Sequence, residues 1–133
     1  IMAGTVSESL TCNRSPVKVV TFTCTADASD GSFPATTISA NIKGRLLQIA
    51  TNPDGTTAPQ DNYDITITDA DAIDVLQGVG ANRDTANSEV AAIVYATSLN
   101  PVIAETDTLT LNVTGNNVNS AVTVIKLYWT EGV

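Results

Sequence analysis

Apolar and polar residues alternate along several short stretches of this chain, with the period of a β-strand. The segment from Tyr63 to Thr68 reads YDITIT, in which every second residue is apolar. Residues 109–114 repeat the pattern as LTLNVT. Because successive side chains of a strand point to opposite faces, each segment predicts a strand with one buried and one hydrated face.

Other stretches are apolar on both faces. Residues 17–25 read VKVVTFTCT, residues 90–96 read VAAIVYA, and residues 124–129 read VIKLYW. Strands of this kind lie at the centre of a sandwich or are buried against a partner. Six residues from two of these stretches are therefore candidates for an interface with another chain: Val17, Val19, Val20, Phe22, Tyr128 and Trp129.

Turn signals separate the predicted strands. An apolar segment, 42–50, ends at Asn-Pro-Asp-Gly, in which proline presets φ and glycine accepts a positive φ. Near the C-terminus, the apolar runs before residue 115 and after residue 120 are separated by GNNVNS. This arrangement predicts an antiparallel hairpin, since an Asn- and Gly-rich turn joins two β runs.

Short strands joined by turns predict the all-β class. We expect one domain spanning residues 1–133, an antiparallel β-sandwich or barrel with at most one short helix. The helical candidate is 70–80, in which Ile73 and Leu76 share a face. Residues 1–16 are left open as an extended N-terminal arm. The composition also favours the all-β class, because a chain rich in Thr and β-branched residues suits pleated surfaces.

Charge excludes several functions. The chain has 6 basic and 14 acidic residues, a net charge of −8, and no histidine. Scattered basic residues argue against binding to nucleic acid, which needs clustered Lys and Arg. The absence of histidine removes Ser-His-Asp and Cys-His catalysis and histidine-ligated zinc. No run reaches the length of a membrane span, and no signal-peptide order begins the chain, so we expect a soluble protein that is not exported by its own signal.

Two cysteines and a group of aspartates are the remaining candidates for chemistry. Cys12 and Cys24 pair across a turn-like segment or remain reduced and semi-buried. The spacing of Asp69, Asp71 and Asp74 resembles the start of a calcium loop, although glycine and glutamate are missing at the required positions. The alternatives are that these carboxylates cap turns, or that they form an acid pair for glycoside hydrolysis. We expect no cofactor.

A longer stretch carries a resemblance. Residues 58–89 read APQDNYDITITDADAIDVLQGVGANRDTANSE. This is similar to a motif of small β-rich proteins encoded among the virion genes of tailed bacteriophages. In that motif Ala-Pro-x-Asp-Asn-Tyr-Asp-Ile-Thr-Leu-Thr-Asp precedes Asp-Val-Leu and Gly-Ala-Asn-Arg-Asp-Thr. The C-terminal stretch, 108–129, resembles the family's ending, whereas the N-terminal third has no counterpart. Where the family often has Asp-Gly, this chain has Ala72 and Ile73, which makes the connection less turn-like and more helical.

Within this stretch, a lone arginine between Asn and Asp is typical of a clamp that holds a loop on carboxylates or carbonyls. We therefore expect a structural loop formed by Asn62, Tyr63, Asp64, Asn82, Arg83 and Asp84.

The resemblance implies a non-enzymatic virion structural protein. Its closest functional description is a capsid decoration, or cement, protein on the surface of the virion, assembled in the host cytoplasm. Such a protein stabilises the head by bridging coat subunits, so its partners are the major capsid protein and its own copies, by analogy as a homotrimer. Two alternatives are a tail or head-fibre module that recognises host-surface carbohydrate, and a hydrolase that uses paired aspartates.

Overall fold

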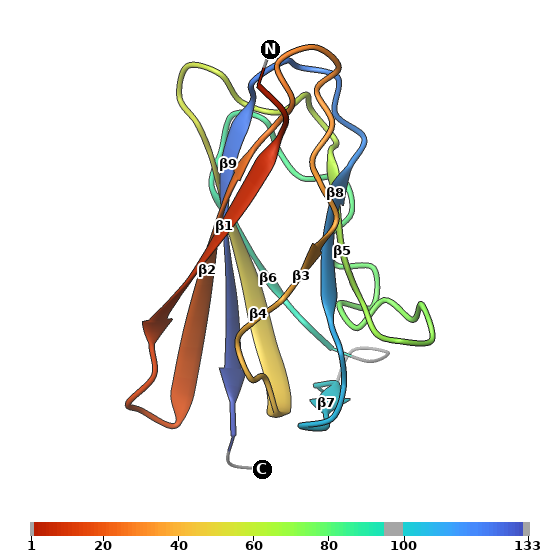
Figure 1. The fold of residues 1–133 in the computed structure, drawn as a ribbon. Coiled ribbons are helices and arrows are strands. Elements are labelled where there is room, and N and C mark those ends of the chain that lie inside the picture. Colours follow the sequence, from red (N-terminus) through yellow and green to blue (C-terminus); the bar gives the residue numbers. More distant parts are fainter. Residues whose placement is uncertain (1, 95–99, 132–133) are drawn as a thin grey trace.

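The structure is a computed structural model that describes residues 2–94 and 100–131. In this part of the chain, nine strands form two antiparallel sheets packed face to face (Figure 1). Sheet A contains β1 (Thr5–Cys12), β2 (Val17–Thr25), β4 (Gly44–Pro53), β6 (Glu89–Ala92), β7 (Val102–Ile103) and β9 (Val122–Thr130). Sheet B contains β3 (Thr36–Thr37), β5 (Asp64–Thr68) and β8 (Thr110–Thr114). The order is β1-β2-β9-β4-β6 in sheet A, with β7 beside β4, and β3-β8-β5 in sheet B.

The predicted all-β sandwich is confirmed, and the described residues contain no helix. Residues 70–80, the helical candidate, form successive turns instead. Ala72 and Gln77 have positive φ angles of 63° and 56°, which a right-handed helix does not allow. The side chain of Asp74 also accepts hydrogen bonds from local backbone amides, an arrangement that competes with helical pairing.

The predicted C-terminal hairpin is wrong. β8 lies in sheet B beside β3 and β5, whereas β9 lies in sheet A between β2 and β4. The connection between them crosses from one sheet to the other, and Gly115 begins it with a φ of 74°. Each strand has one fully buried row of side chains, and the two buried rows face each other across the sandwich. Pairing side by side would have left both rows to be covered by other parts of the chain.

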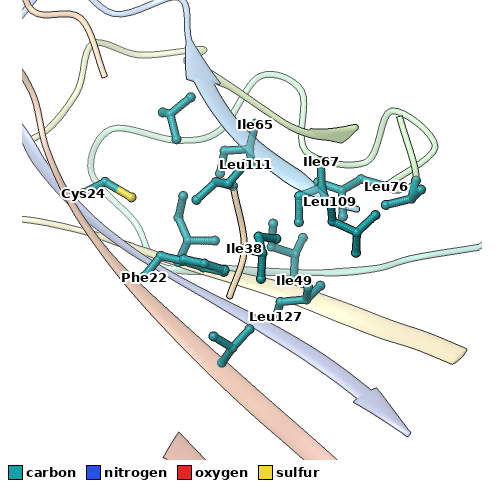
Figure 2. Packing of buried hydrophobic residues seen from close by; sticks show 14 of the residues in the cluster. Phe22, Cys24, Ile38, Ile49, Ile65, Ile67, Leu76, Leu109, Leu111 and Leu127 are labelled. Atoms are coloured by element: carbon teal, nitrogen blue, oxygen red, sulfur yellow. The ribbon is translucent and has the colours of Figure 1, made fainter. Parts of the chain in front are cut away.

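The core lies between the sheets (Figure 2). Figure 2 shows Phe22, Ile49 and Leu127 from sheet A pointing toward Ile65 and Leu111 from sheet B. Three of the interface candidates belong to this core and not to a surface, which corrects the prediction: Val20 and Phe22 are 0% exposed and Trp129 is 1% exposed. They point inward because they occupy the core-facing positions of β2 and β9. The other three candidates, Val17, Val19 and Tyr128, occupy the opposite face.

Of residues 1–16, left open as an extended arm, residues 5–12 form an edge strand. β1 pairs with β2 from Thr5 to Cys12, with a register shift between Leu10 and Cys12, and forms one edge of sheet A. The carboxylate of Glu8 accepts hydrogen bonds from the amides of Ser39 and Ala40, at 2.8 and 2.6 Å. Glu8 therefore ties the crossover between β3 and β4 to the edge strand.

The cysteines are free thiols on paired strands. Cys24 lies opposite Val6, and Cys12 lies opposite Val19, so the register keeps the two sulfur atoms apart. Burial raises the pKa of the Cys24 thiol to about 12, which makes this thiol inert. A hydrogen bond with the Ser15 hydroxyl lowers the pKa of the Cys12 thiol.

Candidate functional site

Residues 69–83 run along the free edge of β5. The amide of Ile65 donates to the carbonyl of Gly80 at 2.8 Å, and the amide of Val75 donates to the carbonyl of Ile67 at 2.7 Å. Asp74 fixes this path, because its carboxylate accepts hydrogen bonds from the amides of Ile67, Leu76 and Gly78. The segment thus satisfies the edge of sheet B, where unpaired backbone groups would otherwise attract another strand.

The six residues of the expected structural loop come together at the base of this segment. Tyr63 and Arg83 form an antiparallel bridge, in which the Arg83 amide donates to the Tyr63 carbonyl at 2.7 Å. The Asn62 amide donates to the Arg83 carbonyl at 3.0 Å, and the Asn82 amide donates to the Asp64 carboxylate at 2.9 Å. Two stretches that are twenty residues apart in the sequence are therefore joined as neighbours.

Arg83 joins its loop to β6 through side-chain contacts. Its guanidinium donates to the carbonyl of Ala81 at 3.2 and 3.1 Å and lies 3.5 Å from the carboxylate of Glu89. Glu89 in turn accepts from the amide of Asp84 at 2.8 Å. The arginine is a clamp between the loop and β6.

Tyr63 anchors the loop in the core. Its ring is 0% exposed, and its hydroxyl lies 2.9 Å from the hydroxyl of Thr123, which is equally buried. Burial raises the pKa of the Tyr63 phenol.

The carboxylates that suggested calcium do not converge. Asp69 accepts hydrogen bonds from the amides of Asp71 and Ile73. The Asp74 carboxylate accepts hydrogen bonds from three other backbone amides. No cluster of three or more His, Cys, Asp or Glu side chains suitable for a metal ion occurs in residues 2–94 and 100–131. The geometry is that of capped turns, and Asp69, Asp71 and Asp74 do not form such a cluster.

Three other aspartates have lowered pKa values. Hydrogen bonds from Ser29, chiefly from its hydroxyl, lower the pKa of Asp27. The amides of Thr57 and Thr56 lower the pKa of Asp54, and the Ala86 amide is the main cause of the lowering at Asp84. Because the folded-state pKa values are lowered, these groups stabilise the fold fully above the ordinary Asp pKa of about 3.9. That stabilisation is lost as the pH falls through the lowered values.

We expect the variant Asp84→Asn to show a flatter decline of stability in acid than the wild type does. An amide in place of the carboxylate accepts hydrogen bonds but does not titrate, so it removes the contribution of Asp84 below about pH 4. The measurement is the urea midpoint from pH 7 to pH 2. Parallel curves for the two proteins would contradict the assigned role of Asp84.

A second feature is the outer face of sheet A, the face turned away from sheet B. Strand alternation and register place sixteen positions of β2, β4, β6 and β9 on this face. They are Val17, Val19, Thr21, Thr23, Thr25, Arg45, Gln48, Ala50, Asn52, Val90, Ala92, Val122, Val124, Lys126, Tyr128 and Thr130. The two charged residues among them are both cationic, although the chain has a net charge of −8. The described chain places no second layer over this face (Figure 1).

An open depression of about 250 Å³ lies on this outer face. Ser88 closes one side of the depression, where its hydroxyl donates to the side chain of Asn52 at 2.9 Å. The lining residues are Ala50, Thr51, Asn52, Ser88, Val124, Lys126 and Tyr128. An apolar floor bordered by an ammonium, a phenol and an amide is suited to an aliphatic side chain next to a carboxylate.

The sequence did not reveal this depression, apart from Tyr128. Apart from Ser88, its residues come from two strands that are more than seventy positions apart. Only the register of β4 against β9 places Ala50 beside Lys126 and Asn52 beside Val124. The one signal available in the sequence was the extra apolar content of residues 124–129, which marks a strand with two apolar faces.

Comparison of the chain with protein-family models, with curated proteins and with solved structures found no match. No helix in the described residues has the length and apolar character needed to cross a lipid bilayer.

Proposed function

We propose that the chain is a non-enzymatic structural protein of a bacteriophage virion, of the capsid decoration or cement type. In this proposal it lies on the capsid surface, is assembled in the host cytoplasm, and stabilises the head by bridging subunits of the major capsid protein. It acts as a homotrimer, needs no cofactor, and binds neither nucleic acid nor membrane. The resemblance of residues 58–89 to the virion motif is the reason for naming this class.

The outer face of sheet A is the observation that carries the proposal. A protein that binds a shell in many copies needs an uncovered surface of mixed apolar and hydroxyl character, and this face supplies one. Val90 is 65% exposed at the β6 end of this face, and Thr21 and Thr23 of β2, toward the other end, can hydrogen bond to a partner. Large exposed apolar residues grouped on one face mark contact surfaces in soluble proteins.

The use of the carboxylates supports a structural role over an enzymatic one. In the loop from Asp69 to Asp84, the acidic side chains mostly accept hydrogen bonds from backbone amides and hold turns. A glycosidase would instead need two carboxyl groups on opposite sides of a substrate cleft. These hydrogen bonds hold the segment in one rigid shape, and a cement protein needs a rigid shape.

Imaging of purified virions tests the proposal. A decoration protein is expected at symmetric positions over the head in many copies, and its removal should lower the temperature at which heads release DNA. Confinement to one vertex would favour the alternative, a tail or head-fibre module that recognises carbohydrate. Absence of the chain from purified particles would contradict both.

A further inference from the structure

The tip of the loop beside β5 is exposed and apolar. Ile73 is 53% exposed, although a large aliphatic side chain at a turn would ordinarily be covered or replaced by a polar residue. Ala72 before it holds a φ of 63°, a left-handed conformation that is unfavourable for an L residue. The amides of Asp71 and Ile73 both donate to the Asp69 carboxylate, which fixes the tip in this shape.

The same tip carries a carboxylate with no partner. Within the described residues, the side chain of Asp71 makes no hydrogen bond and no ion pair. The tip therefore presents an aliphatic group and a free negative charge two residues apart on a rigid turn.

The depression on the outer face of sheet A has the complementary properties. Lys126 is exposed at its border and forms no ion pair in the described part of the chain. The depression has a volume of about 250 Å³, which is larger than the ~150 Å³ of an enclosed apolar cavity that holds benzene. An aliphatic side chain fits this space with a carboxylate directed at the ammonium of Lys126.

The two surfaces cannot meet within one subunit. The loop tip lies beside β5 of sheet B, on the other side of the sandwich from the outer face of sheet A (Figure 1). A contact between them must therefore join two copies, with different surfaces on each copy. A contact of this type forms a closed ring or an open chain, according to the rotation between neighbours.

We propose that the depression on the outer face of sheet A is the docking site for the Asp71–Ile73 tip of a second copy of this chain. Ile73 enters the depression, and the Asp71 carboxylate pairs with the Lys126 ammonium. This contact supplies the self-association expected of a decoration protein. The inference deepens the proposed function and rests on it for the expectation that copies lie side by side.

Sedimentation velocity of the purified protein over a range of concentrations tests the contact. We expect species larger than the 13.8 kDa monomer, which dissociate as salt is added because an exposed ion pair is screened. The variants Lys126→Glu and Asp71→Lys should each raise the dissociation constant about tenfold or more, since each places like charges together. The double variant restores the opposite charges, and its dissociation constant should return toward that of the wild type.

Ile73→Ser separates the apolar part of the contact from its charge, and it should weaken association without changing the unfolding midpoint. Met2→Ser is its control, because Met2 is 75% exposed, pairs through its carbonyl with the Ala28 amide after β2, and does not line the depression. A wild type that is monomeric at every concentration, or a double variant no better than the single ones, would overturn the inference. Virion binding by a monomeric Asp71→Lys variant would leave the proposed function standing, whereas self-association without virion binding would refute that function alone.

Discussion

Replacing Gly80 with alanine is expected to lower the free energy of unfolding by about 3 kcal/mol, through overpacking against a neighbouring backbone. A Cβ atom on Gly80 would lie 2.1 Å from the carbonyl oxygen of Ile65, and an oxygen in the main chain of β5 cannot rotate away. Relief requires the loop to move off the strand. That movement breaks the hydrogen bond from the Ile65 amide to the Gly80 carbonyl.

Urea denaturation measures this effect, and Gly55→Ala is the matched control. A Cβ at Gly55 meets no atom within 4 Å, so this variant should stay within about 0.5 kcal/mol of the wild type. Equal stability of Gly80→Ala and Gly55→Ala would show that the loop does not press against β5.

The Gly80 variant also has a consequence for assembly. The loop covers the edge of β5, and its displacement exposes the unpaired amides of Ile65 and Ile67. Exposed strand edges pair with other chains, so the destabilised protein should aggregate through this edge. This is the physical reason for such a detailed loop: glycine where the backbones touch, aspartate where amides need acceptors, and arginine where the two ends meet.

The sequence predicted strands well and their partners poorly. β5 follows from YDITIT because a period of two is a local property, and β2 follows from its β-branched content. The error at β8 and β9 arose because Gly115 and the asparagines after it suit a tight hairpin and a crossover equally well. Which sheet a strand joins is decided by burial across the whole molecule, and a short window of sequence does not contain that information.

In the candidate site, too, local features could be predicted from the sequence, whereas contacts between distant residues could not. The sequence placed Tyr63 and Arg83 in one structural loop because both residues lie in one recognisable stretch, but it did not predict the bridge between them. The depression beside Lys126 was not foreseen, because its position depends on the register of two distant strands. Whether a feature could be predicted therefore depended more on how far apart its residues lie in the sequence than on their residue types.

The distribution of charge connects the fold to the proposals. Most carboxylates lie on loops, where backbone amides need acceptors, and the outer face of sheet A is left with Arg45 and Lys126. A chain with a net charge of −8 repels its own copies at long range, so association needs a local region of the opposite sign. The outer face is such a region. Asp71 is a carboxylate that the turns leave unused, which is why charge reversal at this residue is the sharpest test of self-association.

Trp129→Ala is expected to cost about 4 kcal/mol of stability, the range observed when a large aromatic side chain is removed from a core. Trp129 is 1% exposed and lies in register with Leu46 of β4 and Lys18 of β2. Domains of this size are stable by about 5 to 15 kcal/mol, so much of the total would be lost. The measurement is the urea midpoint followed by circular dichroism.

The neighbouring residue provides the control, because Tyr128 points to the opposite side of the same strand. Tyr128→Ala should change stability by about 1 kcal/mol or less, since its side chain is half-buried on the outer face. It should nevertheless weaken self-association, because Tyr128 lines the depression. A pair of variants one residue apart therefore separates the core from the docking surface. If Trp129→Ala weakened association at unchanged stability, the assignment of the two faces of β9 would be reversed.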